Sequence, residues 1–341
     1  MNDYNSWTSD SNNPVESLNH GNWSQDEDTL KSGRNEIATE INHADEKVSV
    51  IIPTLNAGKY LPRLIETLMS QTIKAEIIII DSGSTDTTPA IVEKCVDDHP
   101  DRIHFLQIPK EKFDHGGTRD YALRKSSGKY VVFFTQDALP TTSLCLENLR
   151  KAFSDPDIAA VYGRQVAYPD APDYERLTRE FNYPSTGRIW RESDIPRYGV
   201  KSYFFSNTCS MYRRDLYKNT GGFDTPIITN EDMMMAAKFL HAGYALAYAP
   251  DAAVFHSHKN SLIDDYRRNI RIGYVMQQYR ERLTGAKADS EGMRLVRYVG
   301  KGLVQEKHFL SLGTFCIHAA ARLVGNRAGK AKRRREEQIR M

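Results

Sequence analysis

The chain has 341 residues, of which 40% are hydrophobic and 26% are charged, as in soluble globular proteins with one large or two modest domains. The net charge of +2 conceals an asymmetry, because residues 262–341 carry 18 Lys and Arg against 8 Asp and Glu, and the remainder carries 28 against 36. No apolar run approaches the ~20 residues of a bilayer span. Four scattered cysteines without a CxxC pair or a secretory leader predict reduced thiols in the cytoplasm.

The composition changes along the chain in a way that predicts three regions. Residues 1–45 are rich in Ser, Asn, Asp and Glu without hydrophobic periodicity, so we expect a disordered acidic extension there. Apolar runs begin at Val48 and continue to about residue 260, which predicts a folded domain over residues 46–260. Residues 261–341 have the pattern of basic helices and form the third region.

Short apolar runs alternate with helical patterns between residues 48 and 255. The runs are continuously apolar, which is typical of parallel strands covered on both faces. In chain order, we expect a strand over 48–52, a helix over 60–71, a strand over 77–80, a helix over 89–96, a strand over 103–107, a helix over 118–125, a strand over 130–134, a helix over 143–153, strands over 159–166 and 204–212, a helix over 231–242 and a strand over 245–255. This alternation predicts an α/β fold with a doubly wound, mostly parallel sheet flanked by helices. We expect residues 168–203, rich in aromatic and Arg side chains, to be irregular and functional.

Carboxylates and imidazoles follow the expected strands, at the edge where an open α/β sheet binds its ligands. Asp81 could accept from a nucleobase or ribose, or could form an Asx-type turn that caps the helix expected to begin near Thr88. Asp137 follows a very apolar strand, where a cation or a helix cap would balance its charge. His256 and His258 lie two residues apart and face the same way on a continuing strand, so one of them could complete a metal site with Asp137. A structural role for the histidines is the alternative.

Two of the expected helices begin with further candidate site residues. Gly116 and Gly117 open a helix that also contains Arg119, a pattern that fits close approach to a phosphate but also occurs without a ligand. Glu231 and Asp232 open a later helix, where the dipole favours carboxylates in any case. Neither pattern by itself decides between a functional and a structural role.

Taken in order, these segments resemble the family-2 inverting glycosyltransferases with a GT-A fold. The family's opening-strand, second-strand and acceptor-side motifs correspond to residues 48–56, 79–88, 221–224 and 231–232, and residues 113–120, 135–138 and 255–258 resemble bacterial rhamnosyltransferases of the family more narrowly. Two residues depart from the family pattern. Asp137 alone stands for the usual Asp-x-Asp metal motif, and Asp120 stands where many relatives carry Asn.

The resemblance implies a GT-A catalytic domain over residues 46–260 and a single displacement that inverts the anomeric carbon. Asp232 would be the general base, supported by Glu231. A divalent cation, Mg²⁺ or Mn²⁺, would bind Asp137 and His256, with His258 as the alternative ligand. We expect the nucleotide-sugar site to comprise Thr54, Asn56, Asp81, Gly116, Arg119, Gln136 and Asp137. For the acceptor site, we expect Arg164, Gln165 and Trp190.

The implied reaction is transfer of L-rhamnose from dTDP-L-rhamnose to a hydroxyl of a glycan or lipid-linked glycan, in synthesis of a bacterial surface polysaccharide such as O-antigen. The alternatives are a glycosyltransferase that uses a UDP- or GDP-sugar, and a non-catalytic sugar-binding module with a GT-A-like fold. A nucleotidyltransferase is disfavoured, because Pro53 to Asn56 replace the Gly-rich loop that it needs after the first strand.

The basic C-terminal region predicts contact with an anionic membrane at its inner face. An apolar stripe at helical spacing, with basic neighbours, fits an interfacial helix; it comprises Phe309, Leu312, Phe315, Cys316, Ala319, Leu323 and Val324. A helix packed on the catalytic domain or in a dimer is the alternative. We therefore expect a cytoplasmic protein, peripheral on the cytoplasmic membrane, and no nucleic-acid partner, because no nucleic-acid-binding fold accompanies the charge.

Overall fold

The computed structural model describes residues 46–258, 260–283 and 288–340, so the predicted acidic extension lies outside the described residues. The strands are β1 (Val48–Thr54), β2 (Glu76–Asp81), β3 (Ile103–Gln107), β4 (Tyr130–Phe134), β5 (Leu139–Pro140), β6 (Ile158–Val166), β7 (Arg188–Trp190), β8 (Cys209–Arg213) and β9 (Ala245–Phe255). The helices are α1 (Leu61–Met69), α2 (Thr88–Asp98), α3 (His115–Lys125), α4 (Cys145–Lys151), α5 (Asp173–Asn182), α6 (Ile195–Tyr198), α7 (Arg214–Asn219), α8 (Glu231–His241), α9 (Leu262–Gln278), α10 (Ala288–Gln305) and α11 (Phe309–Arg340).

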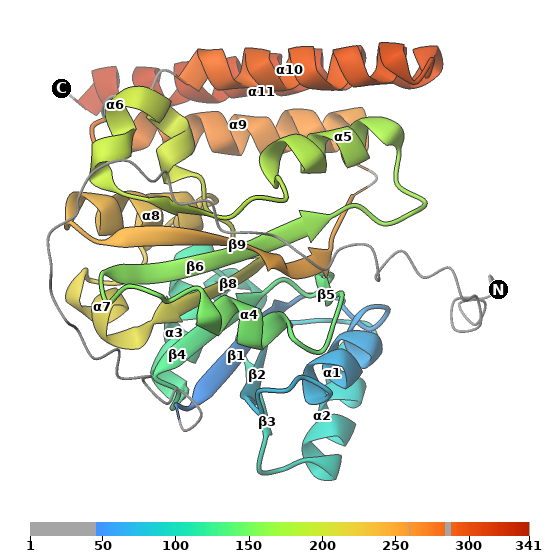
Figure 1. Ribbon diagram of the computed structural model, residues 1–341. Helices are drawn as coiled ribbons and strands as arrows, with labels where there is room; N and C mark the ends of the chain where they lie inside the picture. Colours follow the sequence, from blue (N-terminus) through green and yellow to red (C-terminus); the bar gives the residue numbers. More distant parts are fainter. Residues whose placement is uncertain (1–45, 259, 284–287, 341) are drawn as a thin grey trace, which may run out of the picture.

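In the described residues, the nine strands form one twisted sheet with helices on both faces, which confirms the predicted fold class (Figure 1). The strand order is β3-β2-β1-β4-β8-β6-β9-β5, and β7 pairs with β9 as a branch. Strands β1 to β4 are parallel, β8 is antiparallel to both β4 and β6, and β9 is parallel to β6. The carboxyl ends of β1, β2, β4, β6 and β9 therefore meet the amino end of β8 at one edge.

Alternate residues of the central strands enter two separate cores, which explains their continuously apolar sequences. Val50 and Ile52 of β1 belong to the core that contains α1 and α4, whereas Ile51 belongs to the core that contains α3 and α8. Side chains alternate across a strand, so a strand covered on both faces needs apolar residues throughout. The same division separates Ile79 of β2 from Ile80.

The expectation that residues 168–203 are irregular was wrong for part of the segment. Helix α5 occupies Asp173–Asn182, and β7 and α6 follow it. Tyr174 and Leu177 of α5 are buried against Val299 and Phe315, which belong to α10 and α11. The helix was missed because its apolar residues are few, and the partner surface that buries them comes from more than 100 residues further along the chain.

The C-terminal helices pack on one another and on α5, at the top of the molecule in Figure 1. Helix α11 approaches α9 so closely that glycines are required at the contact. A Cβ atom on Gly329 would lie 2.0 Å from the Ile270 carbonyl oxygen, and one on Gly273 would lie 2.1 Å from the Asn326 carbonyl oxygen. None of the helices in the described ranges combines the length and apolarity of a bilayer span.

Candidate active site

Side chains from five strand ends gather at the shared edge of the sheet. Thr54 and Asp81 close β1 and β2, and Asp137 lies three residues beyond β4. Gln165 is the second-last residue of β6. His256 follows β9 directly, and its backbone N–H donates to the Val166 carbonyl at 2.8 Å. The observed sheet topology thus brings together residues separated by up to 202 positions in sequence.

Asp137, His256 and His258 form a cluster suited to a metal ion. His256 Nε2 lies 3.5 Å from Asp137 Oδ1, and His258 Nδ1 lies 3.6 Å from Asp137 Oδ2. One ligand atom from each residue lies within 4.8 Å of the other two. The structure therefore places both histidines at the cluster, where the sequence left the choice between them open.

The electrostatics of this cluster keep both imidazoles in the neutral form that binds metals. Burial lowers the pKa of His256 well below its ordinary value, and the Arg179 guanidinium lowers it further. Burial is also the main cause of the lowered pKa of His258. One carboxylate and two neutral imidazoles fit a divalent cation, and imidazole ligands favour Mn²⁺ or a later transition metal over Mg²⁺.

Glu231 and Asp232 lie at the same edge, held by the amino end of β8. The Asn207 backbone N–H donates to Asp232 Oδ2 at 3.1 Å, and its side-chain Nδ2 donates to Glu231 Oε1, also at 3.1 Å. Arg119 Nη1 lies 3.2 Å from Glu231 Oε1. The Glu231 side chain is thus paired and only 5% exposed. Asp232 is partly exposed, and the backbone N–H groups of Asn207 and Met233 donate to its carboxylate.

The environment of Asp232 gives it the properties of a base at neutral pH. Burial is the largest cause and the Glu231 charge the second, and together they raise the pKa of Asp232 to about 7. A carboxylate with this pKa is partly ionised at pH 7 and accepts a proton more readily than an ordinary aspartate. The Asp232 charge also contributes to the raised pKa of Tyr183, whose main cause is burial. The Tyr183 hydroxyl contacts Gln165 beside His256, so base and metal cluster are neighbours.

The residues predicted for the nucleotide at β1 and β2 make hydrogen bonds within and between the two loops that follow these strands. Asp81 Oδ2 accepts from the backbone N–H of Ser84 at 2.9 Å, and Oδ1 accepts from the Thr54 hydroxyl at 3.2 Å. The Asx-type turn considered from sequence is therefore present. Asn56 Oδ1 accepts from the backbone N–H of Thr85 at 2.9 Å. Thr54 is buried and supports Asp81, whereas Asn56 is exposed with a left-handed φ of 50°.

Gln136 joins the loops that follow β1 and β4. Its Oε1 accepts from the Leu55 backbone N–H at 2.9 Å, and its Nε2 donates to the Leu55 carbonyl at 3.2 Å. This pair of hydrogen bonds resembles the backbone pairing between two adjacent strands. It fixes the position of the loop before Asp137. Gln136 thus lies between the predicted nucleotide residues and the metal cluster.

At the start of α3, where the sequence suggested a phosphate site, the helix start contacts a neighbouring loop of the protein. Asp114 caps the helix by accepting from the Gly117 backbone N–H at 2.7 Å, and its other oxygen accepts from the Ile227 N–H at 2.7 Å. A Cβ atom on Gly116 would lie 2.4 Å from the Asp224 carbonyl oxygen. Gly116 therefore permits close packing against this neighbouring loop, and Arg119 in the same helix faces Glu231.

The three residues predicted for the acceptor are placed apart from one another. Gln165 is 3% exposed and contacts His256, whereas Arg164 is on the opposite face of β6. Trp190 is also 3% exposed and pairs in register with Leu246, near the amino end of β9 and away from the site edge. The Arg188 guanidinium lies 3.9 Å from the Trp190 ring centroid. The structure brings only Gln165 into the cluster.

Three residues of the site carried too weak a sequence signal to be assigned a place in it. Asn207 precedes a strand without any motif, and Arg179 is in the unpredicted helix α5. Arg268 is on α9 and exposed, and its positive charge contributes to the lowered pKa of both His256 and His258. Arg267 and Arg268 are adjacent in the sequence, so from the sequence alone either guanidinium could be assigned to a diphosphate.

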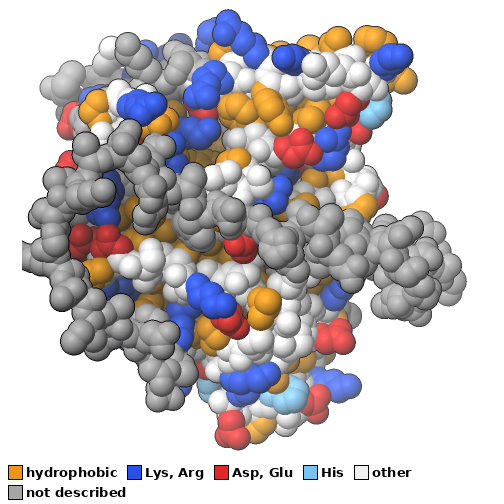
Figure 2. Space-filling model, in the orientation of Figure 1, with side chains coloured by type: hydrophobic (Ala, Val, Ile, Leu, Met, Phe, Trp, Pro, Cys, Tyr) orange, Lys and Arg blue, Asp and Glu red, His pale blue; other side chains and the backbone are white. Residues whose placement is uncertain are grey.

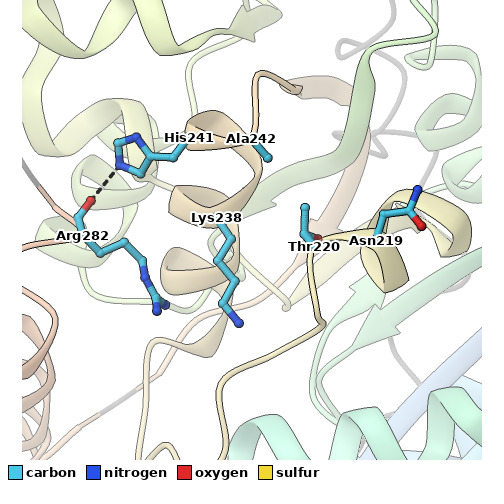
Figure 3. A pocket seen from close by; sticks show the side chains of 6 residues that line it. All are labelled: Asn219, Thr220, Lys238, His241, Ala242 and Arg282. Carbon is cyan, nitrogen blue, oxygen red and sulfur yellow. Dashed lines mark hydrogen bonds between the residues drawn. The ribbon is translucent and has the colours of Figure 1, made fainter.

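A shallow surface pocket lies at the other end of α8 (Figure 3), lined by Asn219, Thr220, Lys238, His241, Ala242 and Arg282. Its two cationic side chains are already paired, because Lys238 Nζ lies 3.2 Å from Asp224 Oδ1 and Arg282 contacts the other oxygen. His241 Nε2 lies 2.8 Å from the Arg282 carbonyl oxygen. The pocket therefore has no part in the carboxylate and histidine clusters.

Comparison with known proteins gives consistent matches. The family described as "Glycosyl transferase family 2" matches residues 49–221. The chain is 35% identical to the O-antigen chain rhamnosyltransferase RfbN of Salmonella typhimurium, over 83% of this chain and 90% of that one. It is 33% identical to the O-antigen chain rhamnosyltransferase WbaN of Salmonella anatum, over 83% and 89%.

Solved structures share the fold at lower identity. The mannosyltransferase PcManGT from Pyrobaculum calidifontis, in complex with GDP-Man and Mn²⁺, has a TM-score of 0.58 and 19% identity, over 82% of this chain and 87% of that one. Residues 1–349 of S. aureus TarS, in complex with UDP-GlcNAc, have a TM-score of 0.53 and 17% identity, over 85% and 92%. These structures therefore share the arrangement of the sheet and helices with this chain.

Proposed function

The chain belongs to glycosyl transferase family 2, and from this premise we propose that it transfers L-rhamnose from dTDP-L-rhamnose to a hydroxyl of a bacterial surface glycan. The support for rhamnose is the similarity, over most of both chains, to two proteins named O-antigen chain rhamnosyltransferases. The observation that carries the chemistry is Asp232, a carboxylate with a pKa raised to about 7, beside an Asp-His-His cluster.

In the proposed reaction, the acceptor hydroxyl oxygen forms a bond to the anomeric carbon as the bond from that carbon to the dTDP oxygen breaks. The electron pair leaves with the diphosphate, and Asp232 takes the hydroxyl proton as general base. Glu231, paired with Arg119, holds the helix start that positions Asp232. A divalent cation bound by Asp137, His256 and His258 would neutralise the diphosphate as it leaves.

The nucleotide would lie over the ends of β1 and β2. Asp81, Asn56 and Gln136 lie at this part of the edge. Their side chains accept from the backbone N–H groups of Ser84, Thr85 and Leu55, which holds the loops in shape before a ligand arrives. Thr54 would act by supporting Asp81. The exposed Arg268 lies near the two histidines, where its charge favours a bound diphosphate.

A thermal-shift panel tests the donor. dTDP-L-rhamnose, a UDP-sugar and a GDP-sugar are each added to the full chain with and without Mn²⁺. A ligand at 100 times its Kd adds about 2.7 kcal/mol of stability, which raises Tm by a few degrees. We expect this rise with dTDP-L-rhamnose and Mn²⁺ together. A rise with another donor would replace rhamnose, and no rise with any donor would favour the non-catalytic module.

We also propose that the acceptor is lipid-linked and that the C-terminal helices contact the anionic surface of the membrane that holds it. The outward face of α11 exposes a row of apolar side chains: Phe309, Leu310, Ile317, Leu323 and Val324. Leu310 is 91% exposed. Residues 309–335 contain seven Lys and Arg and no Asp or Glu. An apolar row bordered by positive charge fits the interface of an anionic bilayer.

The structure divides the apolar stripe considered from sequence into two faces. Phe315 is buried with Tyr174 and Leu177, so this part of the helix packs on the protein, as the alternative interpretation required. Ile317 and Leu323 point outward. Figure 2 shows Lys and Arg side chains along the upper edge of the molecule, over α10 and α11, with hydrophobic side chains between them. A two-fold dimer through this face would place its like charges together, which favours the membrane as partner.

Flotation with vesicles tests this contact. The double variant Leu310→Ser/Ile317→Ser removes exposed apolar side chains without altering a core. Leu144→Ser, at the residue before α4, is the matched control because Leu144 is also exposed. We expect the wild type and the control to float with anionic vesicles and the double variant to float several-fold less. Equal flotation of all three would overturn the assignment of this face, and a concentration-dependent dimer lost in the double variant would assign it to a second copy.

A further inference from the structure

Gln165 is a buried amide whose hydrogen-bonding capacity is fully used. Its Nε2 donates to the Tyr183 hydroxyl at 2.5 Å and to the Ser206 hydroxyl at 2.9 Å. Its Oε1 accepts from Arg179 Nη1 and lies 2.8 Å from His256 Nδ1. Four partners from three different parts of the chain thus converge on one side chain.

Arg179 decides which way this amide faces. A guanidinium has donors and no acceptor, so only the amide oxygen of Gln165 can stand opposite it. Glu175 holds Arg179 in place, accepting from its Nε at 3.1 Å and its Nη2 at 2.7 Å. Since Arg179 cannot lose its charge, it excludes the flipped amide, in which the NH₂ group would face the guanidinium.

The orientation of the amide in turn decides the tautomer of His256. The nitrogen that faces the Gln165 oxygen must carry a proton, and this nitrogen is Nδ1. A neutral imidazole has only one such proton, so Nε2 keeps a free lone pair. Nε2 is the atom that lies 3.5 Å from Asp137 Oδ1. Without Gln165, an Nε2–H could instead donate to Asp137, and the lone pair would point away from the cluster.

We propose that Arg179 and Gln165 are positioning residues that hold His256 as the Nδ1–H tautomer and so present Nε2 to the divalent cation. This inference rests on the proposed metal site, and it gives Gln165 a role other than acceptor binding. Partners behind a metal-binding histidine fix its orientation and tautomer, and their loss weakens metal affinity by roughly 10- to 100-fold.

The first experiment measures Mn²⁺ affinity of the full chain without donor, by titration calorimetry. We expect Gln165→Leu to bind Mn²⁺ roughly 10- to 100-fold more weakly than the wild type. Gln165→Glu should remain within a few-fold of the wild type, because a carboxylate oxygen still accepts from Nδ1 and from Arg179. Gln71→Leu is the matched control, since Gln71 is also a fully buried, hydrogen-bonded amide but lies outside the cluster.

The outcomes separate the two proposals. Equal Mn²⁺ affinity in the wild type and Gln165→Leu would overturn the role of Gln165 and leave the metal site standing. No binding by the wild type would overturn the metal site itself. A loss in Gln71→Leu as large as that in Gln165→Leu would assign the effect to general destabilisation and overturn the positioning role.

The second experiment observes the tautomer directly in the metal-free protein. Nitrogen-15 shifts of labelled histidine distinguish Nδ1–H from Nε2–H, and His256→Asn identifies the His256 signals. We expect Nδ1–H in the wild type and a shift towards Nε2–H in Arg179→Leu, where the amide is free to turn. An Nε2–H signal in the wild type would overturn the inference, because His256 Nδ1 would then have no proton to donate to the Gln165 oxygen.

Discussion

Asn207 Nδ2 donates to Glu231 Oε1 at 3.1 Å, and the backbone N–H of the same residue donates to Asp232 Oδ2 at 3.1 Å. One residue thus holds both carboxylates of the proposed catalytic pair. Its own Oδ1 accepts from the Tyr212 hydroxyl at 2.7 Å and from the Ser210 hydroxyl at 2.9 Å, which fixes the orientation of its amide.

Replacement of Asn207 by Ala should lower kcat without much change in the KM for the donor. The variant keeps the backbone donor to Asp232 but removes the donor to Glu231, and a hydrogen bond to a charged group is worth about 1.5–3 kcal/mol. Steady-state kinetics should therefore show a roughly 10- to 100-fold lower kcat. Ser210→Ala, which removes a partner of the amide but no contact with a carboxylate, is the control, and an equal loss there would contradict the prediction.

Asp232→Asn should remove the general base and lower transfer by roughly 10²- to 10⁴-fold. In the wild type the carboxylate must be ionised to act, so kcat should rise with pH through about 7, following the raised pKa of Asp232. Glu231→Gln should keep a rising limb, since it leaves Asp232 in place, but should move it to lower pH, since it removes the charge that helps raise the pKa of Asp232. A pH profile for Asp232→Asn with the same limb and a normal rate would exclude Asp232 as the base.

The raised pKa of Asp232 also predicts how stability depends on pH. The folded state binds this proton more tightly than the unfolded state does, so the carboxylate costs stability as pH rises from its ordinary value of about 4 to about 7. Asp232→Asn removes this cost. Thermal unfolding should show a larger gain in Tm for the variant at pH 8 than at pH 4, and an equal gain at both values would contradict the pKa.

Chelation should abolish transfer reversibly if the Asp-His-His cluster binds the cation. We expect Mn²⁺ to restore activity better than Mg²⁺, because two of the three ligands are imidazoles. His258→Ala and Asp137→Asn should each weaken Mn²⁺ binding measured by calorimetry. His308→Ala is the comparison variant, because His308, Asp173 and Glu306 form a second group in the described residues that could hold a metal ion. Retained metal binding in both cluster variants would exclude the site.

Gly329→Ala should destabilise the protein, whereas Gly313→Ala on the same helix should not. A Cβ atom on Gly329 would lie 2.0 Å from the Ile270 carbonyl oxygen, and one on Gly313 meets nothing within 4 Å. Overpacking typically costs about 1–3 kcal/mol, while Gly to Ala at an open helical position gains about 0.5–1 kcal/mol. Denaturant unfolding of the two variants measures both effects, and similar values for the two would contradict the close contact of α9 and α11.

The local sequence determined the strands of the domain and the edge at which the candidate residues gather. A run such as residues 77–80 can be fully buried only in a strand covered on both faces, and parallel strands end at one edge, so Asp81, Asp137 and His256 were expected together. These inferences depend on side-chain alternation along a strand and on the helical connections that make successive strands run parallel. Both can be recognised in short stretches of sequence.

Only the tertiary structure decided what each side chain contacts. Gln165 and His256 are 91 residues apart, and their contact depends on the register between β6 and β9, which no local pattern specifies. The role of Gly116 depends on a carbonyl oxygen of residue 224, and the face that α11 presents outward depends on where α5 and α9 bury it. The sequence set the direction and periodicity of each element, whereas the partners were set by how those elements pack against one another.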